Sequence, residues 1–445
     1  MHTTLAGLVK TVISGLIIVL ITGSATAQDN PNQQPPLKHV SFATKAMPVE
    51  VARELRKGFR PSAIFPATDH NLYYHLHWPE FIPHHVVSRA GGISELEYQL
   101  NKKADQAKAR TKLGELTLDE LIKHPHSRVQ GFIVVHKGKI AYEAYPGMRK
   151  TDNHIWMSTS KTIAGLLVGL LEEEGKIDVN KPIDSYLEEF KGSNWEGVRI
   201  IDILDMSNGL DSSENFPNMA NQYHPVSHWQ RLVLHGGKDL KPMNSKQAIL
   251  AVNKEDFGPG QMFHYASMNT QVLGFLVEHM EGKLLSDIIS ERIWSKIGAE
   301  GDAMLGLNDS GGAGIFAMMS TRLRDKARYA MLYTPSWSKV SDEQIISASL
   351  IEKIQKGCRP EIYQRTKKAA LKAGNWFFSV DKDVHCNSRQ WDALYKDGDM
   401  FKSGSHGQGL YVSPARDLVI AYFSTSPLDW QDYARAVAKA VVPNP

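Results

Sequence analysis

The sequence predicts an α+β fold, an antiparallel sheet flanked by helices with an all-helical region inserted mid-chain. Two short strands around a glycine turn occur at residues 132–143, and a second strand pair flanks a proline-containing turn at 409–423. Between these hairpins, most apolar residues recur with helical spacing. Strands at both ends with helices between them indicate a sheet assembled from both ends of the domain.

Composition sets broad limits on function. The chain has 445 residues, of which 42% are hydrophobic and 22% charged, as in ordinary globular proteins. Its formal net charge is only +3, and it contains no long basic run. Neither property is typical of nucleic-acid binding, so no nucleic-acid partner is expected.

The N-terminus has the pattern of an exported protein. Lys10 precedes an apolar run from Val12 to Ile21, and Ala25-Thr26-Ala27 follows. This pattern predicts a signal peptide at 1–27, a periplasmic or secreted mature protein, and no stable membrane anchor after cleavage. The alternative is an uncleaved anchor, but the apolar run is short for a membrane span.

Residues 28–110 are predicted to form a partly helical N-terminal segment ahead of the main domain at 111–445. The segment is rich in histidine, which raises the alternative of a zinc site. No acidic or cysteine ligand recurs at a metal spacing, and prolines interrupt the helix that would align the imidazoles, so we expect no metal. Five of its histidines lie close together in the sequence, namely His70, His75, His77, His84 and His85.

The elements of the main domain follow from periodicity and from helix-ending residues. After the first hairpin, a buried helix is expected to begin near Ser158 and to end at Gly175. Residues 211–260 are polar and irregular, as in segments that line substrate sites. The other predicted helices span 198–206, 245–252, 271–280, 316–333 and 429–441.

Ser158 and Lys161 are the first chemical candidates. They lie three positions apart on the first turn of the predicted helix, so they share one face. A desolvated amine loses its proton more readily, and in the neutral form it can accept the proton of a serine at a helix N-terminus. The alternative is a capping serine beside an exposed lysine, because the Ser-x-x-Lys spacing alone is weak.

Four motifs in order carry a family resemblance. They are Trp156–Lys161, Leu204–Leu210, Pro259–Ser267 and Lys402–Gln408. From about residue 110 to 443 the chain resembles the penicillin-recognising serine hydrolases, which include class C β-lactamases, DD-peptidases and esterases of that fold. Segments 265–274, 293–303 and 406–408 resemble the 6-aminohexanoate-dimer hydrolase-like enzymes most.

The resemblance implies roles for the motif residues. Ser158 is the nucleophile, Lys161 its base, and Tyr265 a proton shuttle whose pKa nearby lysines would lower below about 10. Ser267 stands where class C β-lactamases carry asparagine, which argues against β-lactam turnover. One backbone N–H near Ser405 or His406, with that of Ser158, would form the oxyanion hole. The residues expected to bind substrate are Ser267, Lys402, Gly404, Ser405, His406 and Gln408.

The expected function is hydrolysis of a small ester or amide through an acyl-enzyme on Ser158, without metal or cofactor. One alternative is a β-lactamase or DD-peptidase, and another is a catalytically silent binding protein of the same fold. Whether Lys402 faces the active site stays open at this stage. Cys358 and Cys386 either close one disulfide or remain free thiols.

Overall fold

A computed structural model describes most of the chain. The described residues are 38–64, 68–111, 113–234, 243–308, 310–372, 383–426 and 430–443. The predicted signal peptide at 1–27 lies outside them. None of the described helices is long and apolar enough to span a membrane.

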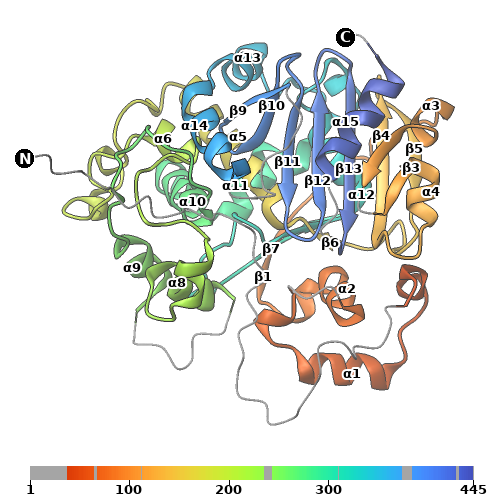
Figure 1. Cartoon of the computed structure of the whole chain (residues 1–445), viewed down its shortest axis with the longest axis horizontal. Coiled ribbons are helices and arrows are strands. Elements are labelled where there is room, and N and C mark those ends of the chain that lie inside the picture. The colour runs from red at the N-terminus through yellow and green to blue at the C-terminus, as the bar shows by residue number, and fades with distance from the viewer. Residues whose placement is uncertain are drawn as a thin grey trace, which may run out of the picture.

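A seven-stranded antiparallel sheet forms the centre of the molecule (Figure 1). Its strand order, β5-β4-β13-β12-β11-β10-β9, joins the first hairpin to the C-terminal strands, as the sequence predicts. In the register of β4 and β13, Ile133 lies opposite Ala421. The strands are β4 (Val129–His136), β5 (Lys139–Ala144), β9 (Val384–Ser388), β10 (Trp391–Tyr395), β11 (Met400–Gly404), β12 (Gln408–Ser413) and β13 (Leu418–Ser424).

Both faces of the central strands are covered. All seven residues of β13 are buried, so this strand reads as a continuous apolar run without polar alternation. The helix α12 (Leu323–Met331) packs on β13 and β4, and α15 (Trp430–Val441) packs on β12. The helix α5 (Lys161–Glu173) lies close to the β9–β10 turn at Gly165. A Cβ at this position would clash with the carbonyl oxygen of Arg389, so the close packing requires glycine.

In chain order, a largely helical region comes between the two halves of the sheet, as predicted, and it lies to one side of the sheet in Figure 1. Its longest helix is α10, which begins earlier than the periodicity indicates. The helices are α6 (Ile200–Leu204), α7 (Phe216–Ala220), α8 (Pro225–Val233), α9 (Ser245–Leu250), α10 (Ser267–Glu281) and α11 (Leu285–Arg292).

A second sheet was not predicted. Its order is β1-β7-β8-β6, from β1 (His84–Val87), β7 (Ala303–Gly306), β8 (Met319–Thr321) and β6 (His154–Ile155). The helix predicted over 316–333 is therefore wrong at its start. Residues 319–321 pair with the strand before Ser158, and the helix begins only at Leu323.

The N-terminal segment is packed onto the main domain. It contributes β1 to the second sheet, paired with β7. Its helices α1 (Val49–Gly58) and α2 (Asp69–Leu76) lie beyond one end of the large sheet, drawn below it in Figure 1. The segment continues through α3 (Lys102–Asp105) into β2 (Lys108–Thr111), after which the main domain begins with β3 (Gly114–Thr117) and α4 (Leu118–Lys123).

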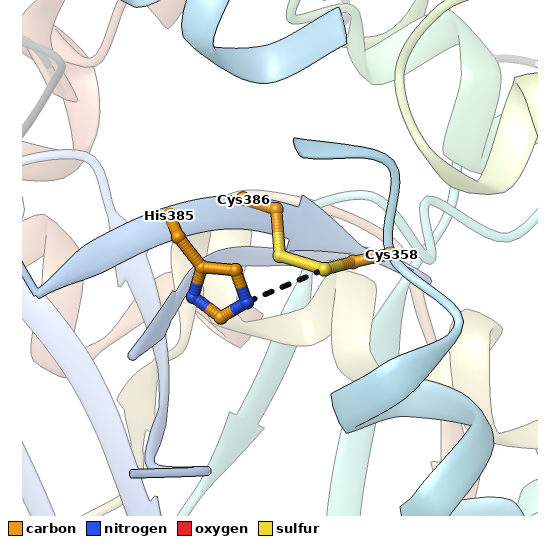
Figure 2. A group of neighbouring side chains, drawn as sticks. All are labelled: Cys358, His385 and Cys386. Carbon is orange, nitrogen blue, oxygen red and sulfur yellow. Dashed lines mark hydrogen bonds between the residues drawn. A yellow bond between two sulfur atoms is a disulfide. The ribbon is translucent and has the colours of Figure 1, made fainter. Parts of the chain in front are cut away.

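Cys358 and Cys386 form a disulfide, which decides the question that the sequence left open (Figure 2). Cys358 lies between α13 (Ala348–Lys356) and α14 (Pro360–Lys372), whereas Cys386 lies in β9. The bond therefore ties this pair of helices to the edge of the large sheet. His385 Nε2 lies 3.6 Å from the sulfur of Cys358.

Candidate active site

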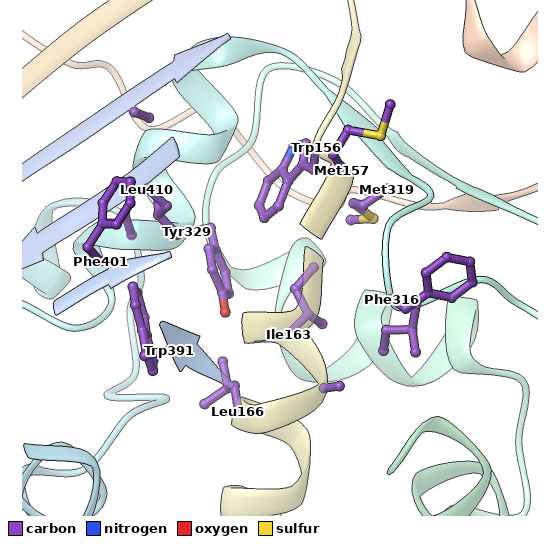
Figure 3. Close-up of a cluster of buried hydrophobic side chains, with 14 of the residues drawn as sticks. Trp156, Met157, Ile163, Leu166, Phe316, Met319, Tyr329, Trp391, Phe401 and Leu410 are labelled. Carbon is purple, nitrogen blue, oxygen red and sulfur yellow. The ribbon is translucent and has the colours of Figure 1, made fainter. Parts of the chain in front are cut away.

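The turn that carries Ser158 is held by buried aromatic packing. The Trp156 ring is fully buried, 5.5 Å from that of Tyr329, and its indole N–H donates to Thr321 Oγ1 at 2.7 Å (Figure 3). Met157 follows with a φ of 48°, a left-handed conformation rare for a residue with a side chain. Such strain is kept only where the surroundings enforce it, and here it precedes the candidate nucleophile.

Lys161 begins α5 directly after the short 3₁₀ turn Met157–Ser160. Its side chain is fully buried, and Nζ lies 3.1 Å from Ser158 Oγ, 2.9 Å from Ser267 Oγ and 2.8 Å from the carbonyl oxygen of Phe316. Burial lowers the pKa of Lys161 to about 7. The structure therefore excludes the alternative of an exposed lysine.

Tyr265 approaches the same hydroxyl from the loop before α10. Its phenol is hydrogen-bonded to Ser158, and the ammonium nitrogens of Lys161 and Lys402 lie 5.2 Å and 4.8 Å from its ring centroid. Burial and the carboxylates of Asp392 and Glu214 raise the pKa of Tyr265 well above its ordinary value. The expectation of a lowered pKa was wrong, and the phenol keeps its proton at neutral pH.

Ser267 is the first residue of α10 and faces Lys161 rather than open space. Its hydroxyl accepts the hydrogen bond from Lys161, and its backbone N–H donates to Glu214 Oε1 at 2.7 Å. Glu214 is half-buried, and its negative charge raises the pKa of Lys161 against the larger effect of burial. Glu214 was not predicted, because it lies in the irregular 211–260 segment, where no periodicity indicates which way a side chain points.

Lys402 faces the site, which resolves the other open question. Its buried Nζ lies 3.5 Å from the Tyr265 hydroxyl and forms an ion pair with Asp392. Burial lowers the pKa of Lys402, and Asp392 opposes this shift. Asp392 also accepts from the Ser403 backbone N–H at 2.9 Å, which joins β10 to β11 beside the phenol.

Gly404 brings the end of β11 against the nucleophile turn. A Cβ at this position would lie 2.8 Å from the carbonyl oxygen of Trp156, so a larger residue would push the strand away. The 404–408 turn that follows has His406 at a φ of 65° and Gly407 at 86°. Ser405 Oγ lies 2.9 Å from His406 Nδ1 within this turn.

Gln408 does not fit its predicted substrate-binding role. Its side chain is buried, and its amide bridges β12 and β13. Nε2 donates to the Ser424 carbonyl at 2.6 Å, while Oε1 accepts from the Ser424 N–H at 3.1 Å. Gln408 matches the family motif in sequence, but its side chain is used for hydrogen bonds between neighbouring strands of the sheet.

Three of the five histidines clustered at 70–85 have different surroundings. His77 pairs with Glu80 at 2.9 Å, and His85 Nδ1 lies 3.4 Å from Ser286 Oγ, whereas His75 is fully buried. Within the described ranges, the one group of side chains with metal-ligand spacing is Cys358, His385 and Cys386, and its two sulfurs are joined in the disulfide. The histidines therefore give no support to the zinc alternative.

Comparison with known families agrees with the site. The family model described as Beta-lactamase matches residues 118–442, which is most of the chain. The chain belongs to the β-lactamase family. The predicted resemblance, from about residue 110 to 443, is thereby confirmed.

Individual relatives narrow the class. The chain is 27% identical over 297 residues to a 6-aminohexanoate-dimer hydrolase of Paenarthrobacter ureafaciens. The aligned region covers 66% of this chain and 72% of that protein. A Bacillus anthracis structure assigned as a 6-aminohexanoate-dimer hydrolase superposes with a TM-score of 0.70 at 23% identity, covering 85% of this chain and 96% of that one. A family VIII carboxylesterase superposes with a TM-score of 0.51 at 18% identity, covering 71% and 93%.

These relationships identify the protein as a serine hydrolase of the β-lactamase-related class. The two superpositions establish the fold, and the roles of individual side chains rest on the geometry given above.

Proposed function

We propose that the protein hydrolyses small ester or amide substrates through an acyl-enzyme on Ser158, in the manner of a 6-aminohexanoate-dimer hydrolase or carboxylesterase. One observation carries this proposal. Ser158, Lys161 and Tyr265 come from two distant parts of the chain, yet the hydroxyl is hydrogen-bonded to both the amine and the phenol. A nucleophile, a base and a proton donor at one point are what acyl transfer needs.

Lys161 is suited to be the base. A neutral amine has two N–H groups and one lone pair. With Ser267 Oγ and the Phe316 carbonyl taking the two N–H groups, the lone pair is left for the Ser158 proton. With a pKa of about 7, a large fraction of Lys161 is neutral at physiological pH.

The attack of Ser158 Oγ on the substrate carbonyl forms a tetrahedral oxyanion. We assign its two donors to the backbone N–H groups of Ser158 and Ser405, because Gly404 packs β11 onto the carbonyl of Trp156. Each such donor is typically worth on the order of 100- to 1000-fold in rate.

Tyr265 then protonates the leaving oxygen or nitrogen as the tetrahedral intermediate collapses. The transient phenolate lies beside Lys402 Nζ, 3.5 Å away, and regains a proton that Lys161 took from Ser158. A water molecule then attacks the carbonyl of the acyl-enzyme, with Lys161 again as base, and the acid is released from Ser158.

Hydrolysis of p-nitrophenyl butyrate measured beside nitrocefin tests the substrate class. We expect ester turnover that disappears in Ser158→Ala, with slow or no nitrocefin hydrolysis, because Ser267 offers no amide to an acylamido substrate. Rapid nitrocefin turnover would favour the β-lactamase alternative, for which the inward-facing Lys402 is the supporting observation. Inactivity of the folded protein on a panel of esters, oligoamides and β-lactams would favour a silent binding protein.

We further propose that residues 1–27 are a signal peptide and that the mature protein, with an N-terminal segment at 28–110 and a hydrolase domain at 111–445, works in the periplasm or outside the cell. The Cys358–Cys386 disulfide supports this location, since such bonds persist in oxidising compartments. N-terminal sequencing of the protein from an exporting host should find Gln28 first. A mature chain that still begins at Met1 would contradict the proposal.

A further inference from the structure

Three imidazoles from distant parts of the chain meet beside the active site. His75 lies in α2, His154 in β6, and His406 in the 404–408 turn. The ring centroid of His75 is 5.5 Å from that of His154 and 5.5 Å from that of His406, and both contacts are edge-to-face. His75 and His154 are fully buried and His406 nearly so, which makes His75 the bridge between the other two.

The two imidazoles that His75 contacts both belong to segments that lead directly to the proposed reacting groups. His154 lies in β6, four positions before Ser158 and three before the strained Met157. His406 follows Ser405, and its left-handed φ of 65° is unfavourable for a residue with a Cβ. A turn in this conformation needs support from its surroundings. The His75 ring provides that support from the N-terminal segment.

The helix that carries His75 is itself fixed. His75 Nε2 lies 3.2 Å from the Ile64 carbonyl oxygen and 3.2 Å from Asn71 Nδ2. At the start of α2, the buried Arg128 donates to Asp69 at 3.1 Å and to the Thr68 carbonyl at 3.2 Å. Because Arg128 precedes β4, these bonds tie α2 to the large sheet.

Two rings of the bridge, those of His75 and His154, are held in the neutral form by burial. Burial lowers the pKa of His75 well below its ordinary value and that of His154 to about 3. The opposite face of this cluster is aromatic, since the His154 ring stacks on Phe423 at 4.4 Å. Edge-to-face ring contacts have a preferred geometry, so they fix the orientation of the two rings relative to each other as well as burying their surfaces.

We propose that His75 is a positioning residue for the oxyanion hole, through which α2 of the N-terminal segment fixes the 404–408 turn relative to the strand that leads to Ser158. This inference rests on the proposed acyl-enzyme function. It assigns the N-terminal segment, which precedes the part of the chain that matches the family model, a part in catalysis.

Steady-state kinetics on a small ester, with the affinity for phenylboronic acid, test the proposal. A boronic acid on Ser158 places an anionic oxygen in the oxyanion hole. We expect His75→Ala to lower kcat on the order of 10- to 100-fold and to weaken phenylboronic acid binding by a similar factor. KM should stay nearly unchanged. His75→Phe, which keeps a ring with the same edge-to-face contacts, should recover most of both losses.

Leu72→Ala is the matched control, because Leu72 is also fully buried in α2 and is not part of the bridge. We expect it to lower the melting temperature as His75→Ala does while keeping kcat and boronic acid affinity. Unchanged kcat in His75→Ala, or an equal loss in Leu72→Ala, would overturn the inference. An inactive wild type would instead overturn the proposed function, so the two failures are distinguishable.

Discussion

Burial of the Lys161 side chain sets the pKa of its amine and therefore whether it can act as a base. An exposed lysine stays charged to about pH 10, but the fully buried Lys161 has a pKa of about 7. Burial has the largest effect on this pKa and lowers it. The charge of Lys402 lowers the pKa further, whereas the charges of Glu214 and Asp392 raise it by less than burial lowers it. The side chain can therefore take and return a proton near neutral pH.

The base role of Lys161 predicts a pH dependence. The neutral amine is the active form, so kcat/KM on an ester should fall about tenfold per pH unit below about 7 and level off above it. Glu214→Gln removes a charge that raises this pKa, so the acid limb should move to lower pH. Glu189→Gln, in a surface pair with Lys246, serves as the control and should leave the profile unchanged. A Glu214→Gln limb moved to higher pH would contradict the assignment.

Tyr265 carries a second prediction at this scale. Because its raised pKa keeps the phenol protonated, Tyr265→Phe removes a proton donor and not a base. We expect kcat to fall by on the order of 100-fold or more, with little change in melting temperature. The loss should be greater for amides than for p-nitrophenyl esters, whose leaving group needs no proton. Near-normal amide turnover would remove the proton-donor role.

The motifs predicted some site residues and could not predict others. Ser158, Lys161 and Tyr265 were found because short sequence patterns surround them. Asp392 was missed because its strand was missed: the β9–β10 turn consists of Arg389 and Gln390, both with positive φ and without a glycine or asparagine signal. Gln408 was misassigned because a motif names residues but does not say which way a side chain points.

The pairing of β10 with β11 places a buried ion pair beside the phenol of Tyr265. Lys402 and Asp392 lie on these two strands and are both largely buried. The two hairpins and the helices α5, α6, α9, α10, α12 and α15 were predictable from local periodicity, whereas the other helices were not. The pairing of β6 with β8 was not predictable, because β6 has only two residues, β8 only three, and the two strands are far apart in the sequence.

The ion pair gives a prediction about stability. Asp392→Asn leaves the Lys402 ammonium buried without its carboxylate, so we expect the free energy of unfolding to fall by about 3–5 kcal/mol. Combining it with Lys402→Met removes the unpaired charge and should recover most of that loss. Urea denaturation of the two variants measures both effects. A double variant less stable than Asp392→Asn alone would show that the pair itself, and not charge burial, dominates.

At the scale of the whole molecule, the site exists only because distant segments converge. The nucleophile turn follows the first hairpin, Tyr265 belongs to the inserted helical region, and Lys402 and Ser405 come from the C-terminal strands. The sheet that joins both halves of the domain was predictable from where the strand patterns lie. The packing of the N-terminal segment was not, because edge-to-face contacts among imidazoles leave no periodic signal in a sequence.

Covalent labelling of the wild-type protein with a fluorophosphonate, followed by peptide mass spectrometry, tests whether Ser158 is the nucleophile. We expect one adduct, on Ser158, that is absent in Ser158→Ala and forms much more slowly in Lys161→Ala. An adduct on another residue, or none on a folded wild-type protein, would contradict it.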